Sequence, residues 1–412
     1  MNPFRTLASV VRFKRFELNG TKRRLATAAN IADLRLLAKR RLPGGVFDYI
    51  DGAAEDEHTS MRNVSAFSAI EFRPRVLRDV GAPDPSTTVF GRSIPMPLIL
   101  APTGFSRIAD QQGELAVARA AERAGLPYTL STMATRSIED VAAATGPGAR
   151  NWFQVYVWRD RGMLKEMLDR AAVAKYEAIV ITVDTAVLGR RERDVRRGFT
   201  LPPKIGVDTL IDGMLHPSWT LDLLRAEPIT FANMRGTQGK DGKTAVNLSE
   251  YINSQFDPTL AWSDIAWFRE NWSGPIILKG IQRVDDAVLA ADAGLDGIAL
   301  SNHGGRQLDG APPPIELVAP VAEAVAGRCL VICDGGVRRG SDIAKAVALG
   351  ADACMIGRGY LFGLAAAGEA GVDHAIAHFD NGLRRTMALL GAQRVSDLTS
   401  DLVSRPVGGE QI

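Results

Sequence analysis

Eight short apolar runs, most of them followed by a stretch with helical spacing, constrain the fold of this chain more than any other feature. The runs are residues 97–103, 128–132, 152–156, 178–184, 276–280, 297–303, 330–336 and 353–358. Between most of them lie segments such as Gly113–Ala124 and Ser341–Leu349, where alanines and charged residues recur at helical spacing. Eight strand-and-helix pairs predict an α/β fold, a (β/α)8 or TIM barrel, with the chemistry at the carboxyl ends of the strands.

A doubly wound open sheet is the alternative architecture for such an alternating chain. That fold would place a glycine-rich dinucleotide turn after its first strand. The first run is followed by Pro102-Thr103-Gly104-Phe105, which does not have that form. The closed barrel is therefore the prediction.

Two regions lie outside the repeat. A helical lead-in contains a predicted helix around Ile31–Arg41 and a second helix that carries Tyr49. The connection after the fourth strand, about residues 186–262, is far longer than an ordinary loop, which indicates a functional insertion. We predict a basic N-terminal extension over residues 1–30 and one barrel domain over residues 31–412.

The composition excludes several functional classes. The 49 Lys and Arg nearly balance the 47 Asp and Glu, so the net charge of +2 gives no reason to expect nucleic-acid binding. No run approaches the roughly 20 apolar residues that span a bilayer. Cys329, Cys333 and Cys354 lack the spacing of a zinc site or a disulfide framework, so we expect buried reduced thiols, no metal and a cytoplasmic protein.

His303 and Arg306 form the first candidate catalytic pair. They follow the apolar run Gly297–Leu300 and so reach the carboxyl end of a predicted strand together. The glycines between them let the backbone pack close to a flat ligand. A proton-abstracting imidazole can then lie beside a guanidinium that anchors a carboxylate. Because a histidine at a strand end is more often structural, the remaining residues decide between the two interpretations.

Two Gly-Arg segments follow the seventh and eighth strands, where barrels commonly bind phosphate. They are Asp334–Gly340, which contains Arg338, and Gly357-Arg358. Glycine amides can turn toward an anion whose charge the arginines neutralise. These segments predict a phosphorylated cofactor, although glycines at strand ends can also serve only as turns.

Polar residues at the ends of the middle strands occupy alternate positions, so their side chains are expected to point to one face of the sheet. Gln154 and Tyr156 end the third strand, Thr182 and Asp184 the fourth, and Lys279 the fifth. A buried Lys279 needs an anionic partner. Beside a flavin it would stabilise the negative charge of the reduced ring, and otherwise it would pair with a neighbouring carboxylate.

Asp184 is expected to reach the far ring nitrogen of His303, because the fourth and sixth strands have the same parity and their inward side chains can meet in one layer. A carboxylate there would stabilise the imidazolium. Arg191 is expected to join Arg306 in a bidentate clamp on a substrate carboxylate. The alternative for Arg191 is a solvated basic cluster over residues 190–197.

Together these residues resemble the family of FMN-dependent α-hydroxy acid dehydrogenases and oxidases, which includes L-lactate dehydrogenases, glycolate oxidases and (S)-mandelate dehydrogenases. The similarity runs from about residue 30 to about residue 400, and Ser301–Asp309 is its most specific segment. The supporting segments are Phe153–Tyr156, Thr182–Asp184, Asp334–Gly340 and Ile356–Arg358.

The resemblance implies FMN as the cofactor and a small L-2-hydroxy acid as the substrate, with L-lactate oxidised to pyruvate as the first expectation. His303 would be the base, and whether the α-hydrogen leaves as a proton or as a hydride stays open. The implied catalytic residues are His303, Asp184, Tyr156 and Arg306, and the implied substrate contacts are Tyr49, Tyr156, Arg191 and Arg306. The implied cofactor contacts are Pro102, Thr103, Gly104, Ser131, Gln154, Thr182, Lys279, Ser301, Asp334, Gly335, Gly336, Val337, Arg338, Gly357 and Arg358.

Departures from the family pattern bear on the acceptor and the substrate. Gly104 stands where oxidase-type members carry alanine, and Met133 where glycolate oxidases carry tryptophan. Both favour a dehydrogenase that passes electrons to a quinone or another carrier. Residues 213–219 also resemble mandelate dehydrogenases, so (S)-mandelate is the alternative substrate, and an oxygen-using oxidase or lactate monooxygenase is the alternative enzyme. Remoter alternatives are a non-catalytic flavin-binding barrel and a flavin-free sugar-phosphate isomerase. We also expect a homo-oligomer, a tetramer.

The insertion has the composition of a surface that contacts a membrane. Residues 186–246 hold ten Lys and Arg against seven Asp and Glu, a net charge of +3. Within them, Ile205–Leu224 combines many apolar residues with Trp219 and few charges. Such a segment can lie in a bilayer interface, on the inner face of the cell membrane and next to a quinone. It can equally pack on a second subunit or cover the active site.

Overall fold

The computed structural model describes residues 17–197, 206–234 and 256–404. Most of the predicted N-terminal extension, residues 1–16, lies outside the described residues, as do residues 198–205 and 235–255 of the predicted insertion. From residue 17 to residue 30 the chain contains one helix, α2 (Gly20–Leu25), with Asn19 as its N-cap.

Eight parallel strands close into a barrel in the order β4, β5, β6, β7, β8, β9, β10, β11, with β11 returning to β4. Their bounds are β4 Leu98–Leu100, β5 Tyr128–Ser131, β6 Asn151–Tyr156, β7 Ala178–Thr182, β8 Ile276–Ile281, β9 Gly297–Ser301, β10 Leu330–Asp334 and β11 Ala353–Ile356. The predicted (β/α)8 barrel is confirmed. Several strands end earlier than the apolar runs that predicted them, and β4 is the shortest of the eight because Pro102 cannot donate to a strand ladder.

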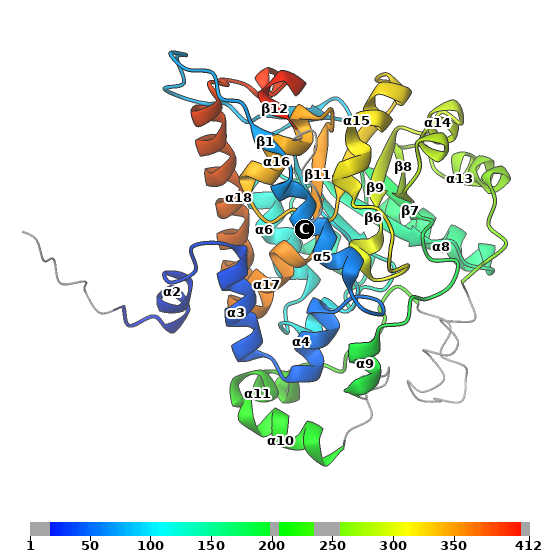
Figure 1. Ribbon diagram of the computed structural model, residues 1–412. Coiled ribbons are helices and arrows are strands. Elements are labelled where there is room, and N and C mark those ends of the chain that lie inside the picture. The colour runs from blue at the N-terminus through cyan, green and yellow to red at the C-terminus, as the bar shows by residue number, and fades with distance from the viewer. Residues whose placement is uncertain (1–16, 198–205, 235–255, 405–412) are drawn as a thin grey trace, which may run out of the picture.

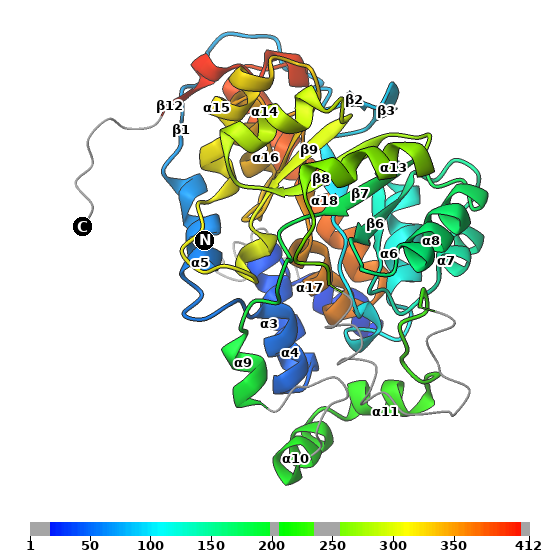
Figure 2. The same cartoon turned by 90° about the vertical axis from the view of Figure 1, so that its right-hand side faces the viewer.

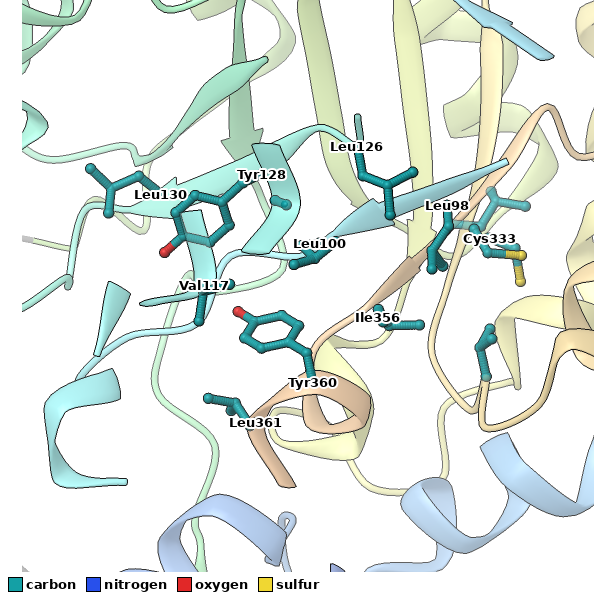
Figure 3. Close-up of a cluster of buried hydrophobic side chains, with 14 of the residues drawn as sticks. Leu98, Leu100, Val117, Leu126, Tyr128, Leu130, Cys333, Ile356, Tyr360 and Leu361 are labelled. Carbon is teal, nitrogen blue, oxygen red and sulfur yellow. The ribbon is translucent and has the colours of Figure 1, made fainter. Parts of the chain in front are cut away.

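Helices surround the barrel on its outside (Figures 1 and 2). They are α6 (Glu114–Arg123), α7 (Ile138–Ala144), α8 (Arg161–Val173), α13 (Ile265–Asn271), α14 (Val284–Asp292), α15 (Pro314–Val325), α16 (Gly340–Ala348), α17 (Arg358–Ala367) and α18 (Glu369–Leu390). The main core lies between these helices and the strands. Figure 3 shows one part of it, where Val117 of α6 and Tyr360 of α17 meet Leu100 of β4 and Tyr128 of β5.

The inside of the barrel explains why the strands read as continuous apolar runs, since both faces of each strand are buried. A second apolar cluster holds inward residues of the strands: Ile99, Ala101, Trp152, Ala178, Val180, Ile277, Ala299, Ile332, Ala353 and Met355. The same cluster includes Val89 and Ile94, which belong to the hairpin formed by β2 (Thr87–Val89) and β3 (Arg92–Ile94). Two residues further along their strands, the same inward face carries Gln154, Thr182, Lys279, Ser301 and Asp334. These polar side chains therefore form the next layer inside the barrel, at the carboxyl ends of the strands.

The lead-in folds as predicted into α3 (Ile31–Arg41) and α4 (Gly44–Asp51), followed by α5 (His58–Ser68). Helix α3 packs on α17, and α5 packs on α15 and on the 3-10 turn His303–Gly305. The lead-in therefore lies beside the carboxyl ends of β9 and β11. A short pairing of β1 (Glu71–Phe72) with β12 (Val403–Ser404) joins it to the end of the described chain.

The described part of the insertion contains α9 (Glu192–Arg196), α10 (Val207–Leu215) and α11 (Pro217–Arg225), and the last two project beyond the barrel (Figures 1 and 2). Hydrogen bonds and an ion pair anchor them: Asp212 Oδ2 accepts from the Gly44 amide at 2.6 Å, Trp219 Nε1 donates to the Ile108 carbonyl at 2.7 Å, and Arg41 pairs with Asp222 at 3.0 Å. Met214 and Leu224 are 70% and 75% exposed. Within the described ranges, no helix has the length and apolar character to cross a bilayer.

Candidate active site

A cavity of about 250 Å³ opens at the carboxyl end of the barrel. Most of the predicted site residues line it: Tyr49, Pro102, Thr103, Gly104, Gln154, Tyr156, Thr182, Arg191, Lys279, His303, Arg306, Asp334, Gly335, Gly336, Val337, Arg338, Gly357 and Arg358. Ser131, Asp184 and Ser301 are not part of the lining. Each is bonded to a residue that is, so the structure brings the whole predicted set together.

His303 and Asp184 form the expected pair. His303 Nδ1 lies 2.9 Å from Asp184 Oδ1, and the Asp184 side chain is only 2% exposed. Burial by itself would raise the pKa of Asp184, but the charge and hydrogen bond of His303 and the charge of Lys279 outweigh it and lower this pKa below its ordinary value. An ionised Asp184 bound at Nδ1 leaves Nε2 of His303 as the ring nitrogen that can exchange a proton.

The backbone at His303 is held in an uncommon conformation. Its φ of 57° is in the left-handed region, which is costly for a residue with a Cβ. The His303 amide donates to Ser301 Oγ at 3.0 Å, and the neighbouring Gly304 carbonyl accepts from Arg358 Nη1 at 2.8 Å. These bonds fix the imidazole at the end of β9 instead of letting the chain continue as a strand.

Arg306 and Arg191 both line the cavity and both lie close to the ring of Tyr49. The guanidinium carbons of Arg191 and Arg306 are 5.4 and 5.2 Å from the centre of the Tyr49 ring. Burial and the charge of Arg191 lower the pKa of Arg306 to about 9. Arg191 is paired with Asp194 at 3.2 Å. Two partly buried cations this close favour an anion between them.

Tyr156 ends β6 beside these groups. Burial and the charge of Asp184 raise the pKa of Tyr156 above its ordinary value, so its hydroxyl stays protonated and can donate a hydrogen bond. Its ring meets Phe256 edge-on at 5.2 Å.

Lys279 has the anionic partner that its burial requires. Its ammonium lies 2.8 Å from Asp334 Oδ2 and 2.9 Å from Ser301 Oγ, and Ser301 itself donates to Asp334 at 2.8 Å. Burial lowers the pKa of Lys279, but the charges of Asp334 and Asp184 raise it further, so the net shift is upward. A fixed positive charge therefore stands at the floor of the cavity.

A row of neutral hydrogen-bonding groups continues the polar layer. Ser131 Oγ donates to Gln154 Oε1 at 3.0 Å, and Gln154 Nε2 donates to Thr182 Oγ1 at 3.0 Å. In the loop after β4, Thr103 Oγ1 is 2.7 Å from the Tyr360 hydroxyl. These bonds hold the side chains in one orientation before any ligand binds.

Arg338 and Arg358 supply positive charge at the ends of β10 and β11. Neither forms an ion pair within the described parts of the chain: Arg358 donates to the carbonyls of Ile50, Gly52 and Gly304, and Arg338 to that of Val337. Burial and the charge of Arg338 lower the pKa of Arg358 to about 10, and burial lowers that of Arg338. Two partly buried guanidiniums that pair with no carboxylate in the described parts of the chain are suited to a phosphate group.

Sequence reasoning missed the apolar wall of the cavity and the residue that fixes part of it. Phe105, Phe231 and Phe256 line the cavity, and the last two come from the insertion. Buried Glu114 binds the amides of Ser106 and Thr135, and thereby joins the loops after β4 and β5. No local pattern marks these residues, because each acts on a segment far from it in sequence.

The profile of the FMN-dependent dehydrogenases matches residues 38–405. The chain belongs to this family of enzymes. Membership of this family implies FMN-dependent oxidation of an L-2-hydroxy acid, in agreement with the resemblance found in the sequence.

Relatives of similar length support this assignment. A protein of Mycobacterium tuberculosis is 46% identical over 395 residues, which cover 96% of this chain and 94% of that protein. An L-lactate dehydrogenase of Chromohalobacter salexigens is 42% identical, with 90% of this chain and 93% of that enzyme covered. The crystal structure of (S)-mandelate dehydrogenase, a monotopic membrane protein, superposes with a TM-score of 0.88 at 37% identity, covering 92% of this chain and 100% of that one.

Proposed function

We propose that this enzyme oxidises L-lactate to pyruvate, with His303 as the base. The observation that carries the proposal is the His303–Asp184 pair at 2.9 Å, at the mouth of a cavity that also holds Arg306 and Arg191. L-lactate is favoured because the relatives named L-lactate dehydrogenase match 90% or more of this chain.

The residues of the cavity fit FMN. The partly buried guanidiniums of Arg338 and Arg358 would hold the phosphate together with Gly335, Gly336 and Gly357. Thr103, Gln154, Thr182 and Lys279 would hold the ring, and the Lys279 ammonium would stabilise the negative charge of the reduced ring. When bound, FMN supplies the acceptor for the electron pair removed from the substrate.

The chain's own residues would then position the substrate and move a proton. Arg306 and Arg191 would clamp the carboxylate in a bidentate manner, with Tyr49 and Tyr156 bonded to its polar groups. His303 would take a proton through Nε2, either from the α-carbon or from the hydroxyl, and Asp184 would stabilise the resulting imidazolium. Loss of two protons, one from the α-carbon and one from the hydroxyl, together with one electron pair converts the 2-hydroxy acid to the 2-oxo acid; a hydride would carry that pair with the α-proton.

(S)-mandelate is the second candidate substrate. The structural similarity to (S)-mandelate dehydrogenase favours it, as does the sequence of residues 213–219. The measurement that separates the two candidates is the rate of flavin bleaching with each acid.

For the acceptor we propose a quinone or another carrier in place of oxygen. Gly104 and Met133 are the residues that support this choice. A Cβ at Gly104 would lie 2.9 Å from Met133 Cβ, so the alanine of oxidase-type members does not fit here without a shift.

We also propose that α10 and α11 attach a cytoplasmic enzyme to the inner face of the cell membrane. Their exposed apolar side chains support this: Leu210, Ile211, Met214, Leu215, Leu221, Leu223 and Leu224. The solved neighbour is itself called a monotopic membrane protein. A homotetramer remains part of the proposal, and light scattering of the purified protein would test it.

Anaerobic bleaching tests the catalytic proposal. The purified protein should be yellow, and L-lactate should bleach it faster than L-mandelate or glycolate. His303→Gln should keep the colour and lose the bleaching. Rapid bleaching of that variant would show that another group is the base.

Flotation with anionic vesicles tests the membrane proposal. Met214→Asp combined with Leu224→Asp should abolish flotation and leave bleaching by substrate unchanged. Leu77→Asp is the matched control, because Leu77 is 101% exposed and lies away from α10 and α11. Unchanged flotation of the double variant would exclude these helices as the membrane contact.

A further inference from the structure

The insertion places one aromatic ring on each of two sides of the cavity. Phe231 is 9% exposed, and its ring centre lies 5.6 Å from that of Phe105, which follows β4. Phe256 contacts Tyr156 of β6 instead. Within the described part of the insertion, Phe231 is therefore the aromatic residue that lines the cavity on the β4 side.

The backbone around Phe231 is fixed to the barrel. The Ala232 amide donates to the Ala134 carbonyl at 3.2 Å, and Asn233 Oδ1 accepts from the Ile138 amide at 2.9 Å, at the start of α7. Arg170 of α8 donates to the Asn233 carbonyl at 3.1 Å. These bonds tie the segment to three separate places on the barrel, so its ring forms a wall in a defined position.

Phe105, the partner of Phe231, is also held in place. Its φ of 62° is in the left-handed region, and its amide donates to the Met133 carbonyl at 3.0 Å. Its ring meets Tyr49 edge-on at 6.3 Å. An aromatic series thus runs from Phe231 through Phe105 to Tyr49, whose ring lies close to both Arg191 and Arg306.

The topology places this wall opposite the catalytic histidine. In the ring of eight strands, β5 and β9 are four positions apart and so face each other across the barrel. His303 and Arg306 follow β9, whereas Met133 follows β5 and Phe105 follows β4. If Arg306 and Arg191 bind the carboxylate and the hydroxyl lies near His303, the side chain at C2 would extend toward this apolar wall.

We propose that Phe231 determines which side chain the enzyme accepts at C2 of the 2-hydroxy acid. Its ring limits the space on this side of the cavity, so a methyl group at C2 is preferred over a phenyl group. This inference rests on the proposed function and assigns a specificity-determining residue that lies in the insertion.

The test measures binding of two unreactive acids that lack an α-hydrogen, 2-hydroxy-2-methylpropanoate and 2-hydroxy-2-phenylpropanoate. Their dissociation constants are read from the change in the flavin visible spectrum of the holoenzyme. Phe231→Ala should lower the dissociation constant of 2-hydroxy-2-phenylpropanoate about 10-fold or more. The dissociation constant of 2-hydroxy-2-methylpropanoate should change less than about 3-fold. The ratio of kcat/KM for L-mandelate over L-lactate should rise in parallel.

Controls keep the result interpretable. Phe231→Leu is the second variant if alanine impairs folding, and it should give a smaller change in the same direction. Phe72→Leu, at β1 and outside the cavity lining, should leave both dissociation constants unchanged.

The possible failures are distinguishable. If Phe231→Ala and Phe231→Leu both keep the wild-type ratio of the two dissociation constants while L-lactate still bleaches the flavin, Phe231 does not determine which substrate side chain is accepted. If the wild-type protein is bleached by no 2-hydroxy acid and binds neither analogue, the proposed function itself fails and this inference fails with it.

Discussion

Arg306 is bonded to the backbone of Tyr49 and also lies over its ring. Its Nη1 donates to the Tyr49 carbonyl at 2.8 Å, and the guanidinium carbon is 5.2 Å from the ring centre. The same nitrogen donates to the Gly52 carbonyl at 2.9 Å. A residue from the end of β9 therefore fixes the C-terminal end of α4, so the lead-in and the barrel form one substrate-binding surface.

Replacing Arg306 by lysine should lower kcat/KM by roughly 10- to 100-fold. A lysine keeps the charge but loses the planar pair of donors that a carboxylate and the backbone of α4 both require. Steady-state kinetics and flavin content measure the effect. The control is Arg190→Lys, an exposed position in the same cluster, which should change neither quantity.

Asp184→Asn should slow bleaching by L-lactate by about 100-fold or more, because an amide cannot stabilise the imidazolium as a carboxylate does. Stopped-flow absorbance without oxygen measures the rate, with Asp286→Asn on α14 as the control. The pKa of Asp184 is shifted below its ordinary value of 3.8, so this carboxylate stays ionised above about pH 4. If acidification already lowers the wild-type rate at a pH above about 4, protonation of another group must be the cause.

Gly104→Ala should lower stability by about 1–3 kcal/mol, since the new methyl group meets Met133 Cβ at 2.9 Å and the Met133 carbonyl at 3.2 Å. Moving Met133 should also alter access to the flavin, and we expect faster peroxide formation in air. Thermal unfolding and a peroxide assay measure the two effects. Gly148→Ala, where a Cβ would meet nothing within 4 Å, is the control.

The interaction of Glu139 with Arg170 should stabilise the fold near neutral pH and lose this contribution at acidic pH. The hydrogen bonds from Arg170 lower the pKa of Glu139 from 4.5 to about 2. Because the folded-state pKa is the lower one, the stabilisation is complete above pH 4.5 and disappears as the pH falls toward 2. Since Glu139 is half exposed, we expect only about 0.5 kcal/mol.

Urea unfolding of the wild-type protein and Glu139→Gln checks this expectation. The variant should be less stable near neutral pH and equal to the wild type at strongly acidic pH. An equal difference at both pH values would assign the effect to lost packing. Because Arg170 also holds the Asn233 carbonyl, the pair supports the segment that carries Phe231.

The sequence by itself determined the barrel and most of its polar layer. Strands alternate with period two, so Gln154, Thr182 and Lys279 had to share a face once their runs were recognised as strands. The positions of His303 and Arg306 followed in the same way from the end of β9. These properties are encoded within a few neighbouring residues, which is why the sequence alone predicted them.

Only the tertiary structure decided how distant segments complete the cavity. It gave Arg358 three carbonyl partners, paired Lys279 with Asp334, and brought Phe231 of the insertion against Phe105. None of these contacts follows from a local pattern. They form because long connections pack their side chains into space that the barrel leaves open, and that packing depends on the whole folded chain.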